Sequence, residues 1–180
     1  ESPSLSMPLP VIFSLWSSCE AKLPTDLLIR TGSAMVRWFW VSLVKLHHIG
    51  IASNNLERSI RQHEELFGLN RISTIVEDPL QKVSLILMSD QRSPGIPIEL
   101  VAPLGDQSPI RNLLKKGMHL YHLCYSVDDI ESTLKKARKQ KAIVVSGPSP
   151  ARLYNGQRIA FIYTPDGYLV EFLEEKAQSP

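Results

Sequence analysis

An internal repeat is the feature that most constrains how this chain can fold. The segment HIGIASNNLERSI starts at His48, and the similar segment HLCYSVDDIESTL starts at His122, an offset of 122 − 48 = 74 residues. In both segments a short apolar stretch leads into polar residues and then into apolar residues at helical spacing. Self-similarity at one offset indicates that the chain builds the same supersecondary unit twice.

Each copy carries the signals of a capped amphipathic helix. Asn54 and Glu57 have the spacing of a capping box, in which the first side chain accepts from a free backbone amide of the opening turn. The second copy repeats this spacing with Asp128 and Glu131. The apolar positions that follow predict the buried faces of two helices: Leu56, Ile60 and Leu66 in the first copy, and Ile130, Leu134 and Ala137 in the second.

Each predicted helix is followed by segments that predict three strands. These are RISTIV, KVSLILM and IPIELVAP in the first copy, and AIVVS, RIAFIYT and YLVEFLE in the second. The turns between them contain DP, SPG, GPSP, NG and PDG, which favour chain reversal. The prediction is an α+β fold of two tandem βαβββ modules, over about 45–104 and 118–175. A loop and a short helix join them, with Pro109 near the start and Gly117 at the end.

Two glutamates stand at equivalent places in the last predicted strand of each module. Glu99 lies in IELV and Glu171 in VEFL, an offset of 171 − 99 = 72 residues. A carboxylate between apolar neighbours must be paired, protonated or bound to metal, because its desolvation is costly. Together with His48 and His122 they supply two negative charges and two imidazoles, a set that matches a divalent cation. We therefore predict a metal site on these four residues, with two coordination positions open to a substrate's oxygens.

Simpler roles for the four residues are also open. A single buried-looking histidine is more often a core residue than a ligand. Either glutamate could instead form an ion pair with Arg152 or Arg158. The repetition of the same His-then-Glu pair favours the metal site, because packing alone gives no reason for the pair to occur twice.

The remaining histidines and the nearby cysteine are expected to be structural or solvated. His47 is expected to face away from His48, because side chains alternate along a strand. His63 falls on the first predicted helix and His119 at the entrance of a strand. Cys124 is expected to share the face of His122 as a small apolar residue, and not to act as a nucleophile.

Residues 1–44 differ from the rest of the chain. They are rich in Ser, Pro and Trp and show no sustained period, so we expect an irregular extension. A secretory signal starting at Met7 is disfavoured, because its apolar patch is short and no Lys or Arg precedes it. A plainer hypothesis is that translation begins at Met35, after an upstream or artificial addition. Residues 176–180 are expected to be a short tail after the domain at 45–175.

The composition narrows the class of partner. A formal charge of +2 is too small to favour nucleic acid or an anionic membrane. No apolar run approaches the roughly 20 residues that a membrane helix needs. Two cysteines, Cys19 and Cys124, are too few and too far apart for a disulfide scaffold, which favours a reducing, cytoplasmic setting. We expect a small molecule as the partner.

The same segments carry a family resemblance. LHHIGIASNNLERSI, IELVAPLGDQSPIRNLLKK and YHLCYSVDDIESTLKKARKQ resemble the vicinal-oxygen-chelate superfamily, which includes glyoxalase I, extradiol dioxygenases and fosfomycin-resistance proteins. Within it, they most resemble the methylmalonyl-CoA epimerases. The resemblance covers about residues 45–175. It implies a cupped mixed sheet around one divalent ion (Co, Mn, Ni, Zn or Fe) on His48, Glu99, His122 and Glu171, commonly in a homodimer.

The resemblance also implies an activity. An epimerase or isomerase of this kind moves a proton at the carbon α to a thioester through a metal-bound enolate, with an acyl-CoA, another thioester or a 2-oxo compound as substrate. Glu171 would then be both a ligand and a catalytic residue. The epimerases carry a second catalytic glutamate where this chain has Leu80. Glu77 and Asp78 lie close by, and a shifted loop would let one of them, with Glu77 preferred, take that role.

Two other functions fit the same scaffold. A glyoxalase-type lyase would use the same four ligands. A non-catalytic binding or drug-resistance protein is favoured by Leu80, which puts an apolar residue where an acid is expected. An extradiol dioxygenase is disfavoured, because its triad of two histidines and one carboxylate leaves Glu99 unexplained.

Overall fold

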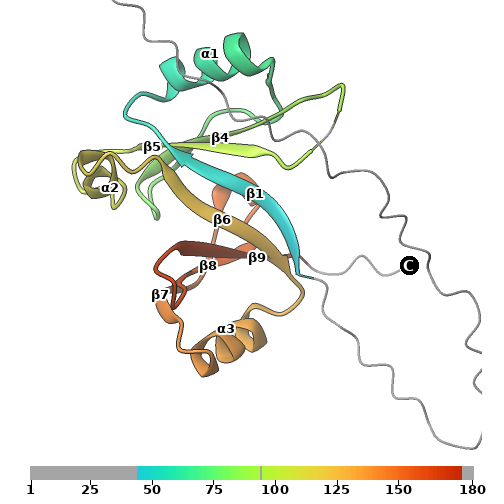
Figure 1. Cartoon of the computed structure of the whole chain (residues 1–180), viewed down its shortest axis with the longest axis vertical. Coiled ribbons are helices and arrows are strands. Elements are labelled where there is room, and N and C mark those ends of the chain that lie inside the picture. The colour runs from blue at the N-terminus through green and yellow to red at the C-terminus, as the bar shows by residue number, and fades with distance from the viewer. Residues whose placement is uncertain (1–43, 94, 176–180) are drawn as a thin grey trace, which may run out of the picture. The chain divides into compact units, whose positions relative to one another are not determined.

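A computed structural model describes residues 44–93 and 95–175 of the chain, which form a nine-stranded mixed sheet flanked by helices (Figure 1). The α+β class predicted from the sequence is confirmed. The extension expected over 1–44 and the tail expected over 176–180 lie outside the described residues, apart from Val44. Within the described part of the chain, no helix combines the length and the apolar character needed to cross a membrane.

The first module has the predicted order of a strand, a helix and further strands. It consists of β1 (Lys45–Ala52), α1 (Leu56–Phe67), β2 (Asn70–Arg71), β3 (Val76–Asp78), β4 (Val83–Ser89) and β5 (Ile98–Pro103). The prediction of one strand for RISTIV is wrong, because β2 and β3 are separate short strands that both pair with β4. Between them the Ser73 hydroxyl takes the place of a backbone acceptor and receives a hydrogen bond from the Leu87 amide at 2.9 Å.

The second module repeats this plan. It consists of β6 (Leu120–Val127), α3 (Ile130–Lys139), β7 (Ile143–Pro150), η1 (Arg152–Tyr154), β8 (Arg158–Tyr163) and β9 (Leu169–Glu174). The single 3-10 turn η1 was not expected from the sequence. The link between the modules contains α2 (Arg111–Lys115), and Gly117 follows it with a φ of 72°, which is consistent with the predicted end of a short helix.

The strand order places the two modules side by side in one sheet. It runs β2-β4-β5-β1-β6-β9-β8-β7, with β3 also pairing β4. The first strands of the two modules, β1 and β6, pair antiparallel in the middle of the sheet. Each of them pairs in parallel with the last strand of its own module, β1 with β5 and β6 with β9. The strands that carry the candidate histidines and glutamates are therefore direct neighbours.

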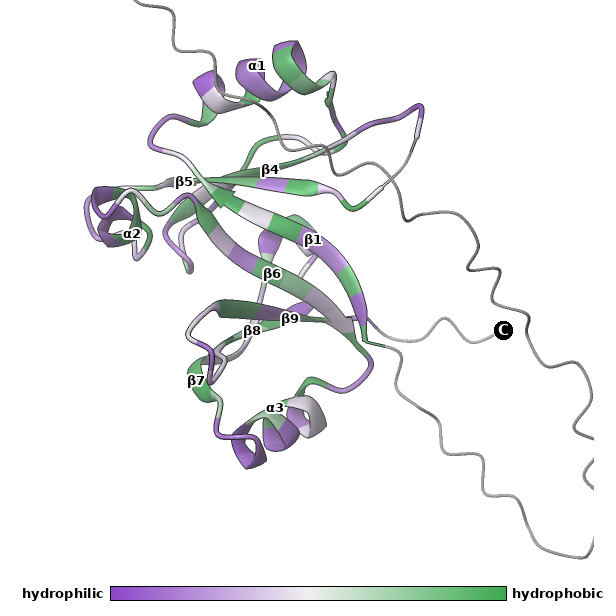
Figure 2. Ribbon diagram, in the orientation of Figure 1, coloured by the Kyte–Doolittle hydropathy of each residue, from purple (hydrophilic) through white to green (hydrophobic). Residues whose placement is uncertain are grey.

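Side chains alternate between two buried faces of the sheet, as the period of a strand requires. On one face α1 packs against Ile86, Met88 and Leu100, and α3 packs against a cluster that includes Ile162 and Phe172. The other face carries two further apolar clusters, formed by Val83, Leu85, Val101 and Ala52 in one module and by Cys124, Ile159 and Leu173 in the other. Figure 2 shows both hydrophobic and hydrophilic residues along β1 and β6.

Both long helices begin one residue later than the capping-box spacing predicted. Asn55, and not Asn54, is the N-cap of α1, and its side chain accepts a hydrogen bond from the third amide after it at 2.9 Å. Asp129, and not Asp128, caps α3 in the same way at 3.0 Å. The second polar residue of each pair has the extended backbone that a cap needs, with φ of −143° and −140°.

The buried face of α1 is narrower than the apolar pattern predicted. It is formed by Leu56, Ser59, Ile60 and His63. Leu66 is 66% exposed, because six residues at about 100° each place it about 240° around the helix from Ile60. In α3 the predicted face is confirmed, since Ile130 and Leu134 are buried and Ala137 packs against the same cluster.

Replacing the observed cap tests this assignment. We expect Asn55→Ala to lower the free energy of unfolding by about 0.5–2 kcal/mol, because an amide of the first turn of α1 loses its acceptor. Asn54→Ala is the matched control, since it removes the same side chain from the adjacent exposed position. Urea unfolding measures both variants. An equal or larger loss in Asn54→Ala would contradict the cap.

Candidate metal centre

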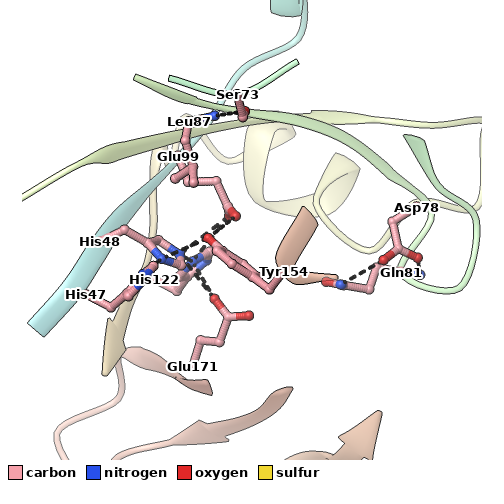
Figure 3. A network of polar contacts seen from close by, with 10 residues as sticks. All are labelled: His47, His48, Ser73, Asp78, Gln81, Leu87, Glu99, His122, Tyr154 and Glu171. Atoms are coloured by element: carbon pink, nitrogen blue, oxygen red, sulfur yellow. Dashed lines mark hydrogen bonds and ion pairs between the residues drawn. The ribbon is translucent and has the colours of Figure 1, made fainter. Parts of the chain in front are cut away.

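The four predicted ligands converge at the middle of the sheet (Figure 3). His48 on β1 and His122 on β6 come from the two central strands. Glu99 on β5 and Glu171 on β9 come from the strands on either side. Glu99 pairs with Gly50, two residues after His48, and Glu171 pairs with Cys124, two residues after His122. Because side chains alternate along a strand, the histidine and the glutamate of each module face the same side of the sheet.

The ligand atoms lie within a few ångströms of one another. The Nε2 atoms of His48 and His122 are 2.9 Å apart. Oε2 of Glu171 lies 3.2 Å from the first and 3.0 Å from the second. Oε2 of Glu99 lies 3.6 Å and 3.5 Å from the same two nitrogens. All four residues are buried, with at most 4% of any of them exposed.

These distances fit one divalent cation. At a metal–ligand distance of about 2.1 Å, ligand atoms lie about 3.0 Å apart at right angles and about 3.4 Å apart at tetrahedral angles. The observed separations run from 2.9 to 3.6 Å. Oε2 of Glu171 is buried and lies 3.2 and 3.0 Å from the Nε2 atoms of His48 and His122, close enough for the three atoms to share one cation. Two imidazoles and two carboxylates suit Zn, Co, Mn, Ni or Fe.

In the absence of a cation, the charges of the site are balanced by protons. Burial disfavours a charged His48, but its hydrogen bond to Glu171 and the charges of both glutamates outweigh burial and raise its pKa. Burial raises the pKa of Glu99. Burial also acts to raise the pKa of Glu171, but the His122 and His48 rings outweigh it and lower that pKa to about 2. A cation must therefore displace protons when it binds.

Gly50 makes room for the His122 ring. A Cβ atom at Gly50 would lie 2.3 Å from Cε1 of His122, far inside contact distance, and the two residues pair across β1 and β6. The equivalent pair of the other half is His48 with Cys124, which is fully buried, as expected for a small residue on this face. Sequence reasoning did not single out Gly50. The available signal was a glycine inside a strand, which marks close approach of another group.

Tyr154, at the end of η1, is the residue of the site that sequence reasoning missed. Its hydroxyl donates to Oε1 of Glu99 at 3.0 Å and lies 3.1 Å from Nδ1 of His48. Its ring stacks on His48, with centroids 5.7 Å apart and planes 14° from parallel. Burial and the charges of Glu99 and Glu171 raise the pKa of Tyr154, so the hydroxyl keeps its proton. No periodic pattern surrounds this residue, which is why the sequence did not indicate it.

The buried carboxylate of Asp78 holds η1 against the first module. Oδ1 accepts from the amides of Leu80 and Gln81 at 3.0 and 3.1 Å. Oδ2 accepts from the Gln81 side chain and from the Arg152 amide, each at 3.2 Å. Asp78 is therefore a structural anchor between the loop before β4 and the turn that carries Tyr154 (Figure 3).

The predicted second acid does not join the four ligands in this structure. Leu80 is 63% exposed. Glu77 is exposed on β3, opposite Ser84 on β4, and its carbonyl oxygen accepts from the Arg152 guanidinium at 3.3 Å. Gln81 is the residue of this loop that lines the space beside the ligands.

The alternative in which an arginine pairs with Glu99 or Glu171 is wrong. Arg158 instead binds Glu174 at 2.8 Å and Glu131 at 3.1 Å. The Arg152 guanidinium donates to the carbonyl oxygen of Glu77 at 3.3 Å.

His47 does not face away from His48 as predicted. The pairing of β1 with β6 skips this position, which makes His47 the extra residue of a bulge and turns its ring toward its neighbour. Nδ1 of His47 lies 2.9 Å from Nδ1 of His48. His63 and His119 are structural, as predicted, since their Nδ1 atoms bond the carbonyl oxygens of Ser59 and Ala52 at 2.8 and 2.9 Å.

A larger hollow adjoins the centre. The space directly beside the ligands is about 10 Å³, enough for about one water molecule. Gln81, Tyr121 and Phe161 line this space and also line a hollow of about 590 Å³. A volume of that size lies within the range of small-molecule sites, about 300–1,000 Å³. The two spaces therefore lie against the same three side chains.

Comparisons with known proteins bear on the family and the fold. A sequence model of the glyoxalase/bleomycin resistance protein/dioxygenase superfamily matches residues 47–161. The mitochondrial methylmalonyl-CoA epimerase of Dictyostelium discoideum is 32% identical over 140 residues, which cover 76% of this chain and 81% of the relative. The crystal structure of methylmalonyl-CoA epimerase from Mycobacterium tuberculosis has a TM-score of 0.64 and 29% identity, and the match covers 77% of this chain and 92% of that one. The lactoylglutathione lyase of Haemophilus influenzae is 27% identical over 135 residues, 74% of this chain and 95% of the relative.

Filling the space at Gly50 should impair the centre. We expect Gly50→Ala to weaken divalent-metal binding by at least about 10-fold, because the added methyl group displaces the His122 ring. Gly147→Ala is the matched control, since a Cβ at that position meets no atom within 4 Å. Titration with Co²⁺ measures both affinities. Equal affinities in the two variants would contradict the role of Gly50.

The stabilisation that a bound cation gives should grow with pH. The pKa of His48 in the folded protein lies above its ordinary value of 6.5. Its proton therefore stabilises the metal-free fold fully at pH values below 6.5, and this stabilisation is lost as the pH rises through the raised pKa. A cation replaces the lost positive charge. We expect the rise in melting temperature on adding Zn²⁺ to be larger above that pKa than at pH values below 6.5. A rise that is the same in both ranges would contradict this account.

Proposed function

Because the chain belongs to the glyoxalase/bleomycin resistance protein/dioxygenase superfamily, we propose that it is a divalent-metal-dependent epimerase or isomerase, similar to methylmalonyl-CoA epimerase. The proposed reaction is proton transfer at the carbon α to a thioester. The observation that carries the proposal is the convergence of four buried donors, with the two histidine nitrogens 2.9 Å apart and each of them within 3.6 Å of both carboxylate oxygens.

The proposed ligands are His48, Glu99, His122 and Glu171. A cation held there acts as a Lewis acid that stabilises negative charge on a substrate's oxygens and so makes the adjacent C–H bond more acidic. Four protein donors leave two positions of an octahedral cation for a chelating substrate. The sheet and the burial of all four ligands keep bulk water away from the charge that develops.

Glu171 is the proposed proton-accepting residue. Its lowered pKa keeps the carboxylate ionised near neutral pH, and its Oε2 lies 3.2 and 3.0 Å from the Nε2 atoms of His48 and His122. Epimerisation also needs a group that returns a proton to the opposite face of the substrate. Glu77 remains the proposed candidate, which requires β3 itself to move so that the exposed carboxylate of Glu77 turns inward. A positioned acid and base each contribute about 10²–10⁴-fold to rate.

The adjoining hollow supports a substrate larger than the reacting group. Its walls are mainly apolar, with Tyr121, Phe161 and Leu169 among them. Lys82 lies at the hollow as well, with its ammonium 3.1 Å from the Gln107 side-chain oxygen. An acyl-CoA, whose thioester sits at the end of a long anionic chain, is the proposed substrate class.

A lyase acting on a glutathione hemithioacetal is the second candidate. The similarity to lactoylglutathione lyase of Haemophilus influenzae favours it, and the same four ligands serve it. The two activities differ in substrate, so parallel assays separate them. A homodimer and a cytoplasmic location are further proposals that rest on the family resemblance and on cysteine usage.

Exchange of the α-proton tests the proposed function. Protein loaded with Co²⁺ and desalted should retain about one metal per chain and exchange the α-proton of methylmalonyl-CoA for deuterium in D₂O. We expect Glu171→Gln to lower the exchange rate by at least about 10²-fold, because a ligand and a proton acceptor are lost together. Glu65→Gln, an exposed change on α1, is the matched control and should exchange at the normal rate.

The outcomes separate the competing functions. Bound metal without exchange, together with turnover of the glutathione hemithioacetal, would replace the epimerase by the lyase. Tight binding of a small molecule without metal or turnover would support a binding protein. Exchange that survives in Glu171→Gln would remove this residue from the mechanism.

A further inference from the structure

One contact in the site joins equivalent residues of the two modules. His48 meets His122, and the two are separated by 74 residues. Leu80 and Tyr154 lie in corresponding places of the two modules. Leu80 is in the loop between β3 and β4, and Tyr154 is in the connection between β7 and β8.

The two places are used differently. Tyr154 turns inward, stacks on His48 and directs its hydroxyl to Oε1 of Glu99 (Figure 3). Leu80 turns outward and is 63% exposed. The outer nitrogens of the two histidines differ in the same way. Nδ1 of His48 has the Tyr154 hydroxyl at 3.1 Å, whereas Nδ1 of His122 is buried and has no hydrogen-bond partner among the described residues.

We propose that Tyr154 is a positioning residue of the metal centre, an inference that rests on the metal site proposed above. The Nδ1–H of His48 donates to the tyrosine oxygen, and the tyrosine O–H donates to Oε1 of Glu99. This arrangement leaves Nε2 of His48 and Oε2 of Glu99, the two atoms that face the centre, free to bind a cation. One side chain of the second module thus orients both ligands that the first module supplies.

The direction of each hydrogen bond follows from the chemistry of the groups. An ionised carboxylate can only accept, so the tyrosine proton points to Glu99 and the tyrosine oxygen is left to accept from His48. A histidine that binds metal through Nε2 carries its proton on Nδ1, and a partner there fixes both the tautomer and the ring orientation. Asp78 keeps the tyrosine in place, because it holds the start of η1 through the Arg152 amide.

Tyr154→Phe tests the inference, because it removes the hydroxyl and keeps the ring stacked on His48. We expect Tyr154→Phe to weaken Co²⁺ binding about 10–100-fold and to change the visible absorption spectrum of bound Co²⁺. Tyr125→Phe is the matched control. It removes the same atom from β6, where Tyr125 packs with the α3 cluster, and should leave both measurements unchanged. His47→Leu tests the other group that lies near Nδ1 of His48.

Each result decides between separate conclusions. Unchanged affinity and an unchanged Co²⁺ spectrum in Tyr154→Phe would overturn the inference, even if the metal-free variant melts at a lower temperature, because that pattern marks a purely structural role. Loss of affinity in His47→Leu but not in Tyr154→Phe would assign the orienting role to His47 and overturn it as well. Wild-type protein that binds no Co²⁺ would overturn the proposed metal function, and this inference with it.

Discussion

Burial of two carboxylates at the middle of the sheet is the constraint on which the rest of the site depends. Glu99 lies on β5 and Glu171 on β9, the strands on either side of the central strands β1 and β6. Clusters of buried apolar residues lie on the same sheet. The negative charge of the two carboxylates has to be balanced locally. Within the described residues, the basic groups clustered with these two carboxylates are the two histidine rings. The same balance is available from protons or from one divalent cation, and the separations of the four atoms match the cation.

Duplication explains how such a set arises and where it stops being symmetric. Each module supplies one histidine from its first strand and one glutamate from its last, and the parallel pairing of those strands brings them together. The surroundings are not duplicated. Gly50 lies beside His122 where Cys124 lies beside His48. Tyr154 contacts both ligands of the first module, whereas Nδ1 of His122 has no hydrogen-bond partner among the described residues.

The proposed chemistry uses each part of this arrangement. The four ligands fix the cation, Glu171 presents an ionised carboxylate beside it, and the hollow behind Tyr121 and Phe161 has room for the unreactive part of a substrate. The similarity to epimerases and to a lyase agrees with one scaffold that serves several reactions. The loop from Asp78 to Gln81 is where this chain departs from the pattern expected of an epimerase, and it is also the loop that touches both the turn of Tyr154 and the space beside the ligands.

The sequence by itself determined the repeat, the α+β class and the four residues that converge, because each of these follows from a periodic pattern or from the same unusual residue at two equivalent positions. It missed what depends on the exact backbone path. The helix N-caps are Asn55 and Asp129, one residue later than predicted. A β-bulge turns His47 toward His48. Only the tertiary structure revealed Gly50 and Tyr154 as parts of the site. Their roles come from contacts across strands and between modules, which leave no period in the chain.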